Sequence, residues 1–156
     1  MIYLLYFLTV LGVFLFMEGV AWFTHKYIMH GFLWSWHKSH HHPYDGFFEK
    51  NDLFSIVFSI PSISLFLCGL VFQNNWLYAI GLGILCYGIF YVIFHDVIVH
   101  RRVKIKYKAT SDYMKRLIRA HKVHHKTQTK EHAEAFGFLF APKKYAVKDK
   151  LDLLDN

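Results

Sequence analysis

The feature that most restricts the fold of this chain is its long stretches without charged residues. Residues 53–94 contain no charged side chain, and residues 1–24 contain only Glu18. An α-helix needs about 20 apolar residues to cross the hydrocarbon core of a bilayer. The sequence therefore predicts membrane-spanning helices at about 2–23, 53–72 and 76–94, with a polar turn at 73–75. The first of these lacks a basic start and a cleavage signal, so we expect it to be a retained span and not a signal peptide.

The two remaining segments, 25–52 and 95–156, carry nearly all of the charge. Residues 95–156 contain 15 Lys and Arg and 7 Asp and Glu, a net charge of 15 − 7 = +8. Three spans place both segments on one side of the membrane, and the positive-inside rule predicts that this side is cytoplasmic. The basic segment would rest on anionic lipid headgroups or dock an acidic electron donor. We expect one all-α, membrane-embedded domain over 1–156, with three to four spans and a helical, histidine-rich cytoplasmic cap.

Histidines repeat in the two polar segments and are absent from the predicted spans. The chain has 12 histidines, and ten of them form His-x4-His followed by His-x2-His-His, twice. At this histidine content roughly 0.07 matches to His-x2-His-His are expected by chance. The first set is His25, His30, His37, His40 and His41, and the second is His95, His100, His121, His124 and His125.

The spacing indicates metal binding. Positions i, i+3 and i+4 share one face of a helix, so His-x2-His-His directs three imidazoles to one side. A five-residue spacing aligns less well on a straight α-helix, but it can converge at a helix end or in a π-bulge. Ten imidazoles are enough for about two coordination spheres, whereas a structural zinc site closes at about four ligands. His42 and His132 stand outside the repeat, and we expect neither to be a ligand.

Other side chains are candidates to support such a site. Metal-bound histidines commonly donate their free N–H to a carboxylate. Glu18, Asp52 and Asp96 are candidates for this role, although Glu18 could instead be a buried acid satisfied by a neighbouring helix. Four aromatic residues near the first predicted span could line a substrate entry or form an interfacial aromatic belt, and these are Trp22, Phe23, Trp34 and Trp36.

These motifs resemble the fatty acid hydroxylase superfamily of membrane di-iron oxygenases. Between them, the sequence is similar to the bacterial β-carotene 3-hydroxylase branch, over about residues 12–145. The similar stretches are 25–31 (HKYIMHG), Trp36-His37, 48–53 (FEKNDL), His95-Asp96, Val99-His100, 136–139 (FGFL) and Ala141-Pro142. The resemblance implies that the ten motif histidines bind two iron ions. It also implies O2 as co-substrate, β-ionone rings of carotenoids as substrate, a ferredoxin-type electron donor with its reductase, and the bacterial inner membrane as location.

Three other functions compete with this one. The chain could be another oxygenase of the superfamily, acting on sterols, on fatty acids or as a carotenoid ketolase. It could be a metal transporter, but transporters place their ligands near the bilayer midplane, and the predicted spans contain no histidine. It could be a structural membrane protein with a zinc-stapled cap, which ten ligands without cysteine argue against. Nothing in the sequence indicates nucleic-acid binding.

Overall fold

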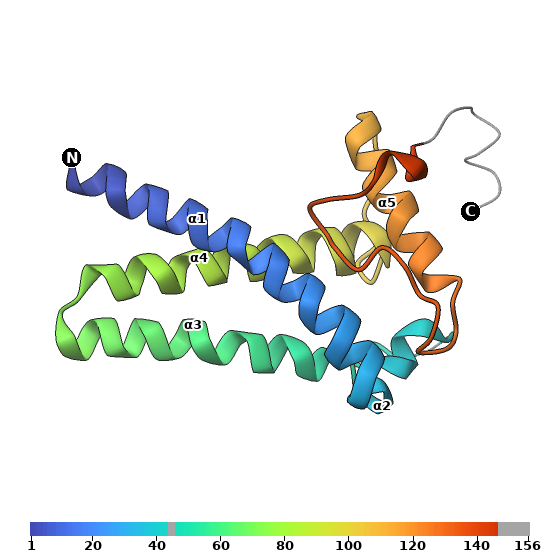
Figure 1. Cartoon of the computed structure of the whole chain (residues 1–156), viewed down its shortest axis with the longest axis horizontal. Helices are drawn as coiled ribbons and strands as arrows, with labels where there is room; N and C mark the ends of the chain where they lie inside the picture. Colours follow the sequence, from blue (N-terminus) through green and yellow to red (C-terminus); the bar gives the residue numbers. More distant parts are fainter. Residues whose placement is uncertain (44–45, 147–156) are drawn as a thin grey trace.

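The computed structural model describes residues 1–43 and 46–146, and every regular element in these residues is helical. Three long helices, α1 (Ile2–Phe23), α3 (Asp52–Phe72) and α4 (Asn75–Tyr91), run lengthwise, and α4 packs against both others. Shorter helices gather at one end of this bundle, opposite the N-terminus (Figure 1). They are α2 (Trp34–His37), α5 (Asp112–His125) and the 3-10 turns at Lys38–His41 and Lys143–Tyr145.

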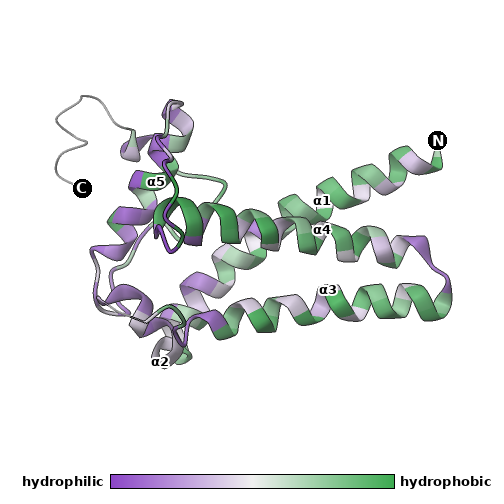
Figure 2. Ribbon diagram, turned by 180° about the vertical axis from the view of Figure 1, so that it is seen from behind, coloured by the Kyte–Doolittle hydropathy of each residue, from purple (hydrophilic) through white to green (hydrophobic). Residues whose placement is uncertain are grey.

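Within the described residues, three helices are long and apolar enough to cross a membrane, as the sequence predicts. With their π-helical extensions they cover Ile2–Phe32, Asp52–Phe72 and Asn75–Val99. Apolar residues cover all three helices, whereas polar residues collect at the cap and at the α3–α4 turn (Figure 2). Large apolar side chains such as Phe16 and Val71 are exposed along the helices, which is unfavourable in water but suits a lipid environment. The protein is therefore an integral membrane protein.

The predicted turn between the last two spans is present. Gln73 ends α3 in the left-handed conformation, with φ 48° and ψ 42°. The Asn74 side chain then caps α4 by accepting a hydrogen bond from the backbone N–H of Trp76 at 2.9 Å. Helix α3 continues through Pro61, because neighbouring groups in a membrane protein can accommodate proline inside a helix.

Small residues allow α4 to approach its neighbours closely. A Cβ added at Gly83 would lie 2.6 Å from Val13 Cβ and 2.9 Å from the Val10 carbonyl oxygen of α1. A Cβ added at Gly81 would lie 3.3 Å from the Ser62 carbonyl oxygen of α3. Gly81 and Gly83 therefore allow α4 to pack closely against α3 and α1.

We predict that Gly83→Ala destabilises the bundle by about 1–3 kcal/mol, because the added methyl group forces α1 and α4 apart. Thermal unfolding in detergent measures the change as a lower midpoint. Gly12→Ala on α1 is the matched control, since an added Cβ there meets nothing within 4 Å. Equal midpoints for the two variants would contradict the close approach of α1 and α4.

Candidate metal centre

Two π-helical turns align the histidines that are five residues apart. Helix α1 passes into the π-helical segment Thr24–Phe32, and α4 passes into the π-helical segment Val92–Val99. In the second segment the His100 backbone N–H donates to the His95 carbonyl at 2.9 Å, an i to i+5 bond. A π-helical turn places residues i and i+5 nearly above one another. A π-helical turn, one of the two ways in which a five-residue spacing can converge, is therefore present after both helices, and it aims both members of each His-x4-His pair at the cap interior.

The two His-x2-His-His motifs lie on short helices that face these turns. His37, His40 and His41 occupy α2 and the 3-10 turn that follows it. The second motif ends α5, whose start is capped by Ser111 accepting from the Met114 backbone N–H at 3.2 Å. Eight of the ten motif histidines are buried, and His100 and His125 are half-buried.

The ten histidines form two groups of five. In each group, one nitrogen from every ring lies within 4.8 Å of the others. We name the first group site 1 and the second site 2. Site 1 comprises His25, His30, His37, His41 and His124, and site 2 comprises His40, His95, His100, His121 and His125.

The two motif sets are interleaved between the sites. Site 1 takes four histidines from the first set and His124 from the second, whereas site 2 takes four from the second set and His40 from the first. In both cases the exchanged residue is the i+3 member of His-x2-His-His. The three imidazoles of each motif do face one region, as predicted, but they divide between two neighbouring sites. The ring centroids of His41 in site 1 and His125 in site 2 are 4.5 Å apart.

Outer hydrogen bonds fix which nitrogen of each site 1 ring faces inward. All five Nδ1 atoms donate to oxygen acceptors at 2.6–3.1 Å. The acceptors are the backbone carbonyls of Phe136, Lys130, Thr127 and Glu134, and the side-chain oxygen of Asn51. Since these oxygens can only accept, each Nδ1 carries the proton and each Nε2 carries a lone pair. Five lone pairs then converge in a buried space, an arrangement that favours a cation between them.

The nitrogen separations suit metal coordination. In site 1, His37 Nε2 lies 3.1 Å from the Nε2 atoms of both His25 and His41. In site 2, His121 Nε2 lies 2.9 Å from His125 Nε2 and 3.1 Å from His100 Nε2. Two imidazole nitrogens at about 2.1 Å from one metal ion and at a right angle are about 3 Å apart. The residues present therefore fit a two-metal centre with five imidazoles at each position.

Burial keeps these rings neutral and available as ligands. Desolvation lowers the pKa of His37 to about 3 and that of His100 to about 4. Desolvation also holds the pKa values of His40, His121 and His124 well below the ordinary value of 6.5. Protonated imidazole cannot bind a metal ion, so low pKa values favour occupancy at neutral pH.

Site 2 is supported by carboxylates, unlike site 1. His40 Nδ1 donates to Glu49 Oε1 at 2.9 Å, and His95 Nδ1 donates to Asp96 Oδ1 at 2.7 Å. Arg102 lies behind these acids and donates to Glu49 at 2.7 Å and to Asp52 at 2.7 Å, while Asp96 lies 4.0 Å away. An imidazole that donates its N–H to a carboxylate is a more basic metal ligand than one that donates to a carbonyl. The two metal positions are therefore chemically inequivalent.

The three predicted supporting acids have different positions. Asp96 contacts a motif histidine, as predicted. Asp52 contacts no motif histidine. It accepts from Arg102 and from the Glu49 backbone N–H at 3.0 Å, and it is Glu49 that contacts His40. Glu18 contacts no histidine among the described residues, because seven residues of helix separate it from His25. It accepts from Tyr87 and from a C-terminal loop instead.

Sequence reasoning did not single out Glu49, Asn51 or Arg102 as functional. The first two precede α3 in a loop without periodicity, and their only signal was their place in the stretch 48–53 that resembles the hydroxylases. His42 and His132 belong to neither site, and His132 is exposed.

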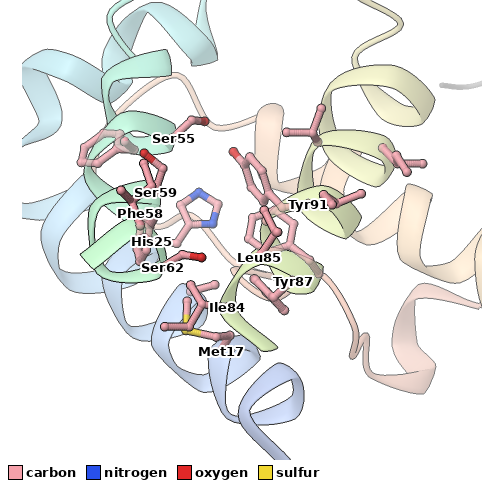
Figure 3. Close-up of a pocket in the computed structure, with 18 of the residues that line it drawn as sticks. Met17, His25, Ser55, Phe58, Ser59, Ser62, Ile84, Leu85, Tyr87 and Tyr91 are labelled. Carbon is pink, nitrogen blue, oxygen red and sulfur yellow. The ribbon is translucent and has the colours of Figure 1, made fainter. Parts of the chain in front are cut away.

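A cavity of about 450 Å³ leads from the membrane-spanning region to site 1. Residues of α1, α3 and α4 line it, including Met17, Phe58 and Ile84, and His25 lies at its centre in the view of Figure 3. The hydroxyl groups of Ser59 and Ser62 line it too, but they donate to backbone carbonyls at 2.7 and 2.9 Å. Those hydroxyl hydrogens are therefore not directed at a ligand, and the cavity suits an apolar one.

The four aromatic residues considered for substrate entry lie outside the lining of this cavity. Trp22 and Phe23 pack against Tyr27 and are partly exposed, which fits the interfacial alternative. Trp34 packs against His30 and His41, and Trp36 packs against Phe54, which does line the cavity. Most of the lining comes instead from α3 and from α4 with its π-helical extension.

Comparison with known proteins agrees with this geometry. The family model for fatty acid hydroxylase matches residues 10–143. The chain is 46% identical over 141 residues to the β-carotene hydroxylase of Pantoea ananas, across 89% of this chain and 77% of that protein. It is 40% identical over 148 residues to the β-carotene hydroxylase of Paracoccus sp. (strain N81106 / MBIC 01143), across 94% and 91%.

A plant relative is more distant and longer. The chain is 36% identical over 132 residues to the chloroplastic β-carotene 3-hydroxylase 2 of Arabidopsis thaliana, across 81% of this chain and 42% of that protein. No solved structure matches the chain. The matched region contains all ten histidines of the two sites. The chain belongs to the fatty acid hydroxylase family and, within it, to the β-carotene hydroxylases.

Proposed function

We propose that this protein hydroxylates carbon 3 of the β-ionone rings of carotenoids, converting β-carotene to β-cryptoxanthin and then to zeaxanthin. The observation that carries the proposal is an apolar cavity within the spans that ends at a histidine of site 1. A C40 hydrocarbon dissolves only in the bilayer, and such a cavity lets its ring reach the metal centre without passing through water. Among the described residues, no Asp, Glu, Lys or Arg side chain lines it, which favours a hydrocarbon over a charged group.

The histidines of sites 1 and 2 would hold two iron ions, which supply the activation of O2 that no side chain provides. Overall, the ring C–H, O2, two electrons and two protons give the ring C–OH and water. The chain's own residues position the substrate. Met17, Phe58 and Ile84 exclude water around the ring, and His25 forms the end of the cavity next to site 1. The outer carbonyls, Asn51, Glu49 and Asp96 hold the imidazoles in place.

Electrons would come from a ferredoxin-type protein and its reductase. The net charge of +8 over residues 95–156 supports docking of an acidic donor at the cap. The same charge supports a cytoplasmic cap in a bacterial inner membrane by the positive-inside rule. Residues 147–156 of this segment lie outside the described residues.

The test is expression in a bacterial host that already makes β-carotene, followed by chromatography of the pigments. We expect β-cryptoxanthin and zeaxanthin, and neither in a His37→Ala control that inserts normally. A keto-carotenoid would keep the oxygenase chemistry but change the reaction. Unchanged β-carotene, with the protein in the membrane and electron donors supplied, would contradict the proposal and direct attention to sterols and fatty acids.

The position of the cavity gives a further prediction about the order of products. The two β-ionone rings lie at opposite ends of a long polyene, whereas the cavity meets the two sites at one histidine, His25. The substrate must therefore present its two rings in separate binding events. We predict that free β-cryptoxanthin appears before zeaxanthin in a time course with limiting enzyme. Zeaxanthin formed without a free singly hydroxylated intermediate would contradict one-ended binding.

A further inference from the structure

Glu18 joins three parts of the molecule that are distant in the sequence. It lies on α1, and its Oε2 accepts from the Tyr87 hydroxyl of α4 at 2.7 Å. Its Oε1 accepts from the backbone N–H groups of Phe138 and Leu139 at 2.8 and 2.9 Å. Three hydrogen bonds to a carboxylate within a membrane span form a strong connection, because each is charge-assisted and partly shielded from water. We call residues Phe136–Leu139 the strap.

The strap contacts both metal sites. The Phe136 carbonyl accepts from His25 Nδ1 at 3.0 Å, and so fixes the orientation of a site 1 ring. The buried Phe138 ring is parallel to the His25 ring, with centroids 5.6 Å apart. The same ring meets the site 2 rings of His95 and His121 at 5.6 and 5.7 Å, and it lines the cavity. Phe138 therefore lies in the cavity wall beside rings of both sites, and the Phe136 carbonyl sets the angle of His25.

The strap is shaped for this carboxylate. A Cβ added at Gly137 would lie 2.7 Å from Glu18 Oε1, closer than a carbon and an oxygen can approach without displacement. Only glycine lets the two following backbone N–H groups reach the acid together. Gly137 is thus matched to Glu18, although the two are far apart in the chain.

We propose that Glu18 is a positioning residue that holds the strap against the metal centre, so that His25 keeps its orientation and Phe138 keeps its place in the cavity wall beside both sites. The activity part of its test rests on the proposed hydroxylation. The connection itself is a property of this chain's residues and is measured without turnover.

The experiment compares four variants of the full-length protein in detergent after loading with iron. Glu18→Ala removes all three acceptor contacts, and Gly137→Ala pushes the carboxylate and the strap apart. Glu18→Gln keeps an oxygen for the two backbone donors and is the conservative rescue. Gly19→Ala is the control, since an added Cβ next to Glu18 at that position meets nothing within 4 Å. Hydrogen exchange of peptides covering 136–139 and the rate of iron release to a chelator are measured for each.

We expect Glu18→Ala and Gly137→Ala to speed exchange in the strap and iron release by about tenfold or more, the effect of losing hydrogen bonds to a charged group. Glu18→Gln should stay within a few-fold of the unmodified protein, and Gly19→Ala should match it. Unchanged strap exchange in Glu18→Ala would overturn the proposal. Faster exchange with unchanged iron release would also overturn it, since the strap would then hold no ligand in position.

Pigment conversion by the same variants separates this proposal from the proposed function. Loss of conversion in Glu18→Ala with recovery in Glu18→Gln supports both. If the unmodified protein makes no hydroxylated carotenoid while strap exchange and iron release respond as expected, the positioning role stands and the hydroxylase proposal fails.

Discussion

Replacing His124 with alanine should abolish carotenoid hydroxylation, while the protein still inserts into the membrane. His124 is fully buried and is the one residue of α5 that reaches site 1. Its loss leaves site 1 with four imidazoles and removes the direct link between α5 and that site. Substitutions that only affect partners of metal ligands typically cost 10–100-fold, so loss of the ligand should exceed about 100-fold.

Pigment chromatography and metal content per chain, both scaled to the protein in the membrane fraction, measure the effect. The matched control is His132→Ala, because His132 is exposed and belongs to neither site. This control should retain most of the activity. Near-normal activity of His124→Ala would remove His124 from the ligand set, and an inactive but well-expressed His132→Ala would show that the ligand set is drawn too narrowly.

Replacing Arg102 with methionine should lower activity by about 10–100-fold through site 2. Arg102 donates to Glu49 and Asp52 and lies 4.0 Å from Asp96. Without the guanidinium, three carboxylates repel one another, and Glu49 and Asp96 lose the charge that holds them against His40 and His95. Methionine keeps much of the side-chain length, so the change isolates the charge.

Arg101→Met is the control, because the neighbouring Arg101 is exposed whereas Arg102 is mostly buried. Metal content should fall toward one ion per chain in the Arg102 variant and stay at two in the control. Because the acids contact site 2 alone, the metal that remains should be the one bound by site 1. Equal metal content and activity in both variants would show that the Arg102 cluster has no role in holding site 2.

The sequence was sufficient to predict the spans and the histidines, because both depend on local patterns. Charge-free stretches mark the three long helices, and the π-helical turns follow from a five-residue spacing at the ends of two spans. The distribution of the histidines between two sites could not be predicted. His40 and His124 exchange sites because the 3-10 turn Lys38–His41 packs against the end of α5, which is a tertiary arrangement with no signature in either motif.

The supporting residues were predictable only in part, for a similar reason. Asp96 is adjacent to His95, so its contact is local. Glu18 was noticed as a charge at membrane depth that a neighbouring helix could satisfy, and Tyr87 of α4 does donate to it. Its other two partners are backbone N–H groups 120 and 121 residues further along the chain. Backbone donors carry no sequence signal, and only Gly137 hints at a close approach there. The cavity likewise depends on which faces of α3 and α4 meet, which hydropathy alone does not specify.

The most direct test of the central claim is the source of the oxygen atom in the product. Cells that make β-carotene and express this protein are grown under ¹⁸O2, and their carotenoids are analysed by mass spectrometry. An oxygenase of the proposed kind should give zeaxanthin in which each ring hydroxyl carries one ¹⁸O atom. Hydroxyl groups that contain only oxygen from water, or β-carotene that stays unmodified beside normally inserted protein, would contradict the claim.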